Sequence, residues 1–168
     1  MKIAPALMIC LLGTLQACTP RLDWREVRPA GAGLLALFPC KPEIESREQR
    51  LGEHRLTMGL AVCKAGGQSF SLAWAEVAEP AQVGPALEQM RLSLAQRLQA
   101  RAGVPRPLQV PGMTPHPQAL QQELLAGQQQ AQVAVFARGL RVYQAVMLGA
   151  KPDAAAWETF VPALRLNP

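Results

Sequence analysis

The sequence predicts an α+β fold, in which a mainly antiparallel central sheet of about six or seven strands has two amphipathic helices packed on it. Several short runs alternate between apolar and polar residues, the pattern of strands that bury one face. Two longer stretches repeat apolar residues at three- and four-residue steps, the pattern of amphipathic helices. A hairpin followed by a helix occurs twice, and this order favours helices packed on an antiparallel sheet.

The first half of the chain contains four predicted strands, over residues 34–38, 44–51, 55–63 and 69–77. The first is a compact apolar run that Pro39 ends. The second is charged, which suits the edge of a sheet because charges discourage pairing with another chain. The third and fourth alternate, and in the fourth Phe70, Leu72 and Trp74 share one side. The glycine pair in "AGGQ" between them favours a tight hairpin turn.

The first helix is predicted from Pro85 to about Ala102, and Gly103 ends it. Its apolar face consists of Leu87, Met90, Leu94 and Leu98. The following residues, 103–117, include five prolines, which exclude a helix or an inner strand and predict a stiff connector. His116 lies in this connector and is interpreted as a surface loop histidine.

The second half repeats this order, with strands predicted over residues 120–125, 132–138 and 141–149. The last two form a hairpin about Gly139. Asp153 is then expected to be the N-cap of a second helix, and Pro162 to end or bend that helix near Val161. The apolar face of the second helix consists of Trp157, Phe160, Val161 and Leu164.

The amino terminus resembles the lipobox leader of bacterial lipoproteins. Lys2 precedes an apolar run of about ten residues, which is typical of a signal peptide and too short to span a bilayer. The stretch "LLGTLQACTP" then leads through Ala17 directly into Cys18. The resemblance implies removal of residues 1–17, a diacylglyceryl group on the sulfur of Cys18 and acylation of the new amino terminus. The alternative is a leader cysteine in an ordinary signal peptide.

The domain organisation follows from this leader. Residues 18–32 are expected to form the lipidated cysteine and a tether, and residues 33–168 a single α+β domain. Because Thr19 follows the cysteine where retained lipoproteins carry Asp, the resemblance implies sorting to the periplasmic face of the outer membrane. The membrane is therefore an expected partner, through the lipid anchor.

The charge of the chain argues against a nucleic-acid partner. The whole chain carries +5, and loss of Lys2 with the leader leaves 16 basic against 12 acidic residues, or +4. This excess is mild and lacks the clustered basicity of nucleic-acid binders. Arg47, Arg50 and Arg55 are interpreted as a solvated strand face, with an anion-binding patch as the alternative.

Two cysteines remain in the expected domain after Cys10 leaves with the leader and Cys18 is lipidated. An even pair in an oxidising compartment predicts a disulfide between Cys40 and Cys63. Free buried thiols and a metal or redox site are the alternatives. A zinc site would need three or four ligands, and neither histidine is spaced from the cysteines as a ligand would be. No metal and no cofactor are therefore expected.

The predicted order of elements resembles the Mog1/PsbP-like fold. The stretch "LLALFPCKP" carries the resemblance, because Phe38, Pro39 and Pro42 match a Phe-Pro-x-x-Pro element that often ends the first strand of such domains. The chain is also similar to short lipoproteins of proteobacteria. The fold resemblance implies a binding or assembly module and assigns no site residues.

The inventory of reactive residues favours a protein that is not an enzyme. The sequence contains no Gly-x-Ser-x-Gly, Ser-x-x-Lys or His-Glu-x-x-His motif and no phosphate-binding glycine loop. No catalytic residue is therefore assigned. The one alternative weighed is a glycan-cleaving acid pair, formed by Glu53 or Glu76 with Glu123.

The expected function is a membrane-anchored periplasmic lipoprotein that acts as a non-catalytic interaction or assembly module of the cell envelope. Its partner, an envelope protein, would dock on the edge strand 44–51 or on the proline-rich loop. Deletion of that loop would then abolish binding of the partner without loss of the fold. The alternative is a carrier of a small hydrophobic ligand or lipid. Such a ligand would lie between sheet and helix, against Met58, Leu60, Trp74 and Met90.

Overall fold

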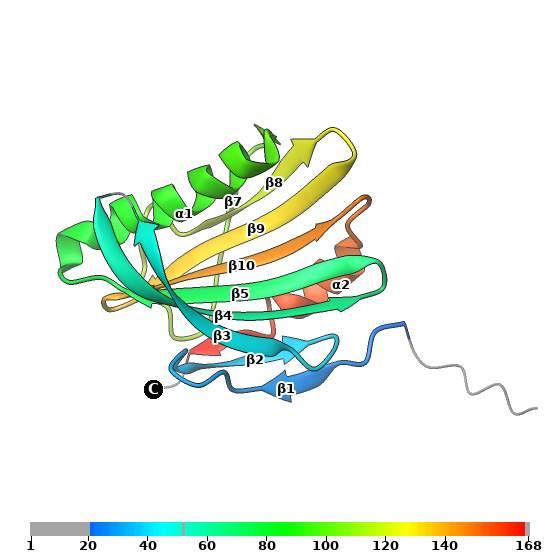
Figure 1. The fold of residues 1–168 in the computed structure, drawn as a ribbon, viewed down its shortest axis with the longest axis horizontal. Helices are drawn as coiled ribbons and strands as arrows, with labels where there is room; N and C mark the ends of the chain where they lie inside the picture. Colours follow the sequence, from blue (N-terminus) through cyan, green and yellow to red (C-terminus); the bar gives the residue numbers. More distant parts are fainter. Residues whose placement is uncertain (1–20, 52, 167–168) are drawn as a thin grey trace, which may run out of the picture.

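The computed structural model describes residues 21–51 and 53–166 and arranges them in three layers (Figure 1). One helix covers one face of a large sheet, and a small sheet together with a second helix covers the opposite face. Cys18 and the predicted leader lie outside the described residues. Their processing therefore stays a prediction.

The large sheet is antiparallel throughout and confirms the predicted fold class. In spatial order its strands are β3 (Glu43–Leu51), β4 (His54–Ala65), β5 (Gln68–Glu76), β10 (Arg141–Gly149), β9 (Gln129–Arg138), β8 (Leu120–Ala126) and β6 (Arg101–Ala102), and β7 (Arg106–Pro107) also pairs with β8. The sheet has 8 strands where six or seven were predicted, because the stretch after the first helix adds β6 and β7. The charged strand β3 lies at an edge, as predicted.

Glycines make the predicted hairpin turns. Gly66 and Gly67 join β4 to β5 with φ of +60° and +76°, and Gly139 joins β9 to β10 with φ of +56°. Residues with a side chain rarely adopt such backbone angles, whereas glycine adopts them at little cost. Both hairpins therefore turn at the glycines that the sequence predicted.

A second, three-stranded sheet was not predicted. It consists of β1 (Arg25–Val27), β2 (Leu34–Phe38) and β11 (Arg165–Leu166), with β2 in the middle. The assignment of residues 34–38 to the central sheet is therefore wrong. The predicted tether also contains β1, and Leu22 already packs against the core ahead of that strand. The apolar run of β2 buries alternate side chains against the central sheet, while the two ends of the domain supply its pairing partners.

The helices confirm their predicted faces, and α1 alone differs from its prediction at its ends. A 3-10 turn, η1 (Pro80–Gln82), leads into α1 (Val83–Leu98), and Gln99 ends α1 in the left-handed conformation. The helix stops short of Gly103 because β6 pairs with β8 directly after it. α2 (Ala154–Phe160) begins as predicted, since the Asp153 carboxylate accepts hydrogen bonds from two backbone N–H groups of its first turn.

The two faces of the central sheet bury different side chains. In β5, Phe70, Leu72 and Trp74 face the small sheet and α2, whereas Ala73 and Ala75 face α1. Gly59 in the neighbouring strand lies under the Trp74 indole, and a Cβ there would approach the ring to 2.1 Å. The indole therefore fits only because residue 59 has no side chain.

A disulfide joins the two sheets and confirms the predicted pairing of Cys40 with Cys63. Cys40 follows β2 and Cys63 lies in β4, with their Cα atoms 6.0 Å apart. The bond therefore holds the small sheet against the central one.

Replacement of both cysteines by alanine is expected to lower the free energy of unfolding by about 3 kcal/mol, because the bond closes a loop of 23 residues in the unfolded chain. Urea unfolding with and without dithiothreitol measures the loss. The reductant should destabilise the wild type and leave the double variant unchanged. Equal unfolding midpoints for the oxidised wild type and the variant would contradict this prediction.

Candidate functional site

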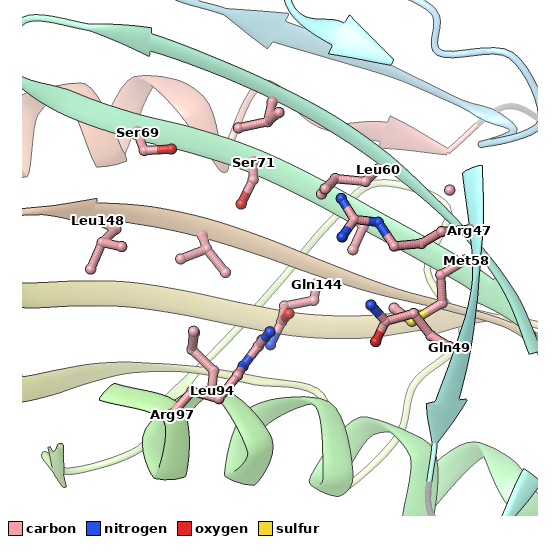
Figure 2. A pocket seen from close by; sticks show the side chains of 14 residues that line it. Arg47, Gln49, Met58, Leu60, Ser69, Ser71, Leu94, Arg97, Gln144 and Leu148 are labelled. Carbon is pink, nitrogen blue, oxygen red and sulfur yellow. The ribbon is translucent and has the colours of Figure 1, made fainter. Parts of the chain in front are cut away.

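The candidate site is a groove of about 260 Å³ on the α1 face of the central sheet (Figure 2). α1 packs over β9 and β10, so the neighbouring strands β4 and β5 are covered less completely on this face. The groove is lined by Arg47, Gln49, Met58, Gly59, Leu60, Val62, Ser69, Ser71, Ala73, Leu94, Arg97, Gln144, Val146 and Leu148. We call it the α1–β3 groove.

The floor of the α1–β3 groove follows from strand alternation. Every second residue of β4, β5 and β10 faces it, and these residues are Met58, Leu60, Val62, Ser69, Ser71, Ala73, Gln144, Val146 and Leu148. Most of them are apolar. Ser69 and Ser71 are half-buried, and their hydroxyls form no hydrogen bond with another of the described residues.

Two arginines reach into the groove from opposite walls (Figure 2). Arg47 extends from β3 and forms an ion pair with Glu45 of the same strand. Arg97 extends from the last turn of α1, and across the described parts of the chain no carboxylate pairs with it. None of the lining residues is acidic. The groove therefore combines an apolar floor with an excess of positive charge.

Gln144 fixes the helix above the floor. Its side chain is 8% exposed, and its Nε2 donates a hydrogen bond of 2.9 Å to the carbonyl oxygen of Met90 in α1. A buried amide is costly without a partner, so this bond ties β10 to the middle of the helix. This hydrogen bond therefore holds α1 against β10 beside the groove.

The predicted carrier lining is half correct. Met58 and Leu60 line the groove as expected. Trp74 does not, because it lies on the opposite face of β5 with the small sheet. Met90 is buried beneath α1 next to the groove without lining it. The sequence analysis missed Arg97, although its three-residue step from Leu94 places both on one side of the helix.

The three arginines predicted as a strand face separate into two positions. Arg50 and Arg55 lie directly opposite each other in the β3–β4 ladder and are exposed. Arg47 lies on the other face of β3, in the groove. These residues therefore do not form one anion-binding patch.

The structure does not bring together the glycan-cleaving acid pair that the sequence left open, Glu53 or Glu76 with Glu123. Glu76 is held by Arg141 at 2.6 Å, and Glu123 accepts a hydrogen bond of 2.9 Å from Gln132. The register separates their rows in the sheet by six residues, or about 20 Å, and Glu53 lies farther still in the turn before β4. Over the described ranges, no three His, Cys, Asp or Glu side chains gather where they could hold a metal ion.

The proline-rich connector is part of the core. Leu108 and Val110 are 5% and 2% exposed, and Thr114 donates its backbone N–H to Ala137 of β9. The expectation that this segment can be deleted without loss of the fold is therefore wrong. His116 is half-buried rather than a free surface residue, because its ring lies against Gly84 at the start of α1.

A buried tyrosine and an ion pair lie at the start of β10, where Tyr143 follows Arg141 by two residues. The Tyr143 hydroxyl donates a buried hydrogen bond of 2.8 Å to the carbonyl oxygen of Ala32, and the ring stacks on Phe136. Burial raises the pKa of Tyr143, and the nearby Arg141 guanidinium partly opposes this rise. The hydrogen bond to Glu76 in turn raises the pKa of Arg141. The Tyr143 hydrogen bond attaches the loop before β2 to the central sheet, whereas the Arg141–Glu76 pair joins β10 to β5.

No known family model matches the chain, and no curated protein matches it. In the part of the chain that the structure describes, no helix is long and apolar enough to cross a membrane. The groove must therefore be interpreted from its own residues.

The single tyrosine of the chain should titrate above its ordinary pKa of about 10 in the folded protein. Unfolded chains lose the phenolic proton first, so the free energy of unfolding should fall as the pH rises from about 10 through the folded pKa. Absorbance at 295 nm, measured with and without urea, reports both midpoints. Tyr143→Phe should abolish the signal and lower stability by about 1 kcal/mol at neutral pH. A folded midpoint equal to the unfolded one would contradict the assignment.

Proposed function

We propose that the chain is a lipoprotein anchored through Cys18 at the periplasmic face of the outer membrane, where it acts as a non-catalytic interaction module. The observation that supports it best is the early start of the packed chain. Leu22 packs on the core, and the Asp23 backbone N–H donates a hydrogen bond of 2.9 Å to the carbonyl oxygen of Pro39. A lipidated Cys18 would stand only three residues before Arg21.

This short distance would hold the domain against the bilayer. Three residues span at most about 10 Å. Arg21 donates a hydrogen bond of 3.0 Å to the carbonyl oxygen of Gly66 in the β4–β5 turn, so this end of the sheet would face the lipid. Lys64 and Lys151 are exposed near the same end and suit anionic headgroups.

The partner surface in this proposal is β3 and its turn toward β4. β3 is an edge strand, eight of its nine side chains are not buried, and Ile44 is 46% exposed. Its charges allow a partner with complementary charges to dock while discouraging unselective strand pairing. The proline-rich connector is not proposed as a docking surface, because Leu108 and Val110 in its middle are buried in the core.

The anchor is tested by metabolic labelling with radioactive palmitate, followed by membrane fractionation. The wild type should carry label and sediment with the outer membrane, whereas Cys18→Ala should carry none and leave the membrane fraction. Cys10→Ala serves as the matched control, since loss of a cysteine of the predicted leader should leave both the label and the Cys40–Cys63 disulfide in place. An unlabelled wild type would refute the anchor.

The partner surface is tested by placing a photo-crosslinking amino acid at Ser46 of β3, an exposed position. A single envelope protein should be crosslinked in the wild-type background. Charge reversal of Arg50 should reduce that band by about tenfold, because complementary charges select the partner. Reversal of the exposed Arg106 at the opposite side of the sheet is the control and should leave it unchanged. Absence of any band, or equal bands in both variants, would count against β3.

A lipid carrier is the second candidate, and the α1–β3 groove favours it. Its floor is mostly apolar and its volume of about 260 Å³ is close to the lower end of small-molecule sites, which is about 300 Å³. An anchored carrier and an interaction module are compatible, since the groove uses Arg47 and Gln49 of β3, whereas Ser46 and Arg50 lie on the other face of that strand.

A further inference from the structure

We infer that the α1–β3 groove binds a single-chain anionic amphiphile, with its acidic group between Arg47 and Arg97 and its acyl chain along the sheet. This inference rests on the carrier candidate and names its ligand class. Four features of the groove support it.

The first feature is charge. The lining contains two arginines and no acidic residue. Glu45 neutralises Arg47, whereas Arg97 has no acidic partner within residues 21–51 and 53–166. Its guanidinium points from α1 toward the sheet, next to Gln144 (Figure 2). A carboxylate or phosphate in the groove would therefore complete an ion pair that the described chain leaves open.

The second feature is the apolar floor. Leu60 and Val62 of β4 and Val146 and Leu148 of β10 lie on either side of β5, which adds Ser71 and Ala73 to the floor, and Leu94 of α1 lies above. Leu60, Val62 and Leu148 are only half-buried, and small-molecule sites are lined mainly by apolar side chains. An acyl chain would remove these three side chains further from water.

The third feature is size. The lining residues extend from the row of Met58 to the row of Ser69, which is six residues or about 20 Å along β5. The volume of about 260 Å³ is small for this length. A long and narrow groove accommodates one acyl chain and excludes a lipid with two.

The fourth feature is the position of one end of the groove. Leu148 and Ser69 face each other in the ladder, one residue from the pair formed by Gly149 and Gln68. This end lies beside the β4–β5 turn, whose Gly66 carbonyl accepts a hydrogen bond from Arg21 at the start of the described chain. An anchored domain would therefore place this end of its groove near the bilayer from which an amphiphile would come.

The test uses the chain from residue 18 onward with Cys18→Ser, and measures binding of laurate, of neutral dodecanol and of cationic dodecyltrimethylammonium by calorimetry and native mass spectrometry. Laurate should bind one to one, and the other two at least about tenfold more weakly, because only laurate forms the charged pair. Arg97→Gln should weaken laurate by about tenfold and leave dodecanol unchanged. Ser71→Leu should fill the floor and abolish binding of every probe.

Arg55→Gln is the matched control, because it removes one positive charge from an exposed position on the other face of β4 and should leave laurate binding unchanged. Urea midpoints within error of the parent chain ensure that each variant is folded. Equal affinities of laurate and dodecanol, or no effect of Arg97→Gln, would overturn the anionic ligand and leave a neutral carrier. Failure of every probe to bind would overturn the carrier as well, whereas the anchor is decided separately by the palmitate label.

Discussion

The central sheet must be covered on both faces, because its middle strands carry apolar side chains on both sides. β5, β10 and β9 contribute buried residues to each of the two cores, so neither face can be left in water at its centre. α1 covers one face, and the small sheet with α2 covers the other. The order of elements along the chain does not decide which strands are covered, since α1 follows the β4–β5 hairpin but packs over β9 and β10.

The coverage is unequal, and the functional site arises from the difference. On one face, three strands, α2 and a disulfide enclose a core that contains the aromatic rings of Phe38, Phe70, Trp74 and Phe160. On the other face a single helix of 16 residues lies over part of the sheet. The Gln144 amide donates a hydrogen bond to the Met90 carbonyl of that helix. The less covered strands beside the helix form the floor of the α1–β3 groove.

The proposed anchor and the groove reinforce one another. Packing begins at Leu22, so a lipid on Cys18 would hold the domain with its β4–β5 turn toward the bilayer. The groove ends beside the same turn, whereas β3 lies at the edge of the sheet and exposes Ser46 and Arg50 on its other face. One orientation at the membrane would therefore serve both a lipid ligand and an envelope partner.

The local patterns were enough to predict the hairpins, the faces of both helices, the Asp153 cap, the charged edge strand and the Cys40–Cys63 pair. These features depend on periodicity, turn residues and cysteine count, all of which are properties of neighbouring residues or of composition. The second sheet was missed because β1 and β11 are three and two residues long. Strands this short carry no alternation that a sequence pattern can reveal, and they form only where β2 offers them a partner.

The sequence by itself determined the class of the fold and the apolar faces of its helices and hairpins, and it motivated the anchor at Cys18. The tertiary structure decided which buried residues share a face, placing Trp74 away from the groove and bringing Arg47 and Arg97 to its two walls. These two arginines are 50 residues apart and lie in different elements, so no local pattern relates them. Only the packing of α1 across β9 and β10 leaves the space between them, because a site made by incomplete coverage depends on where a helix lies and not on which residues it contains.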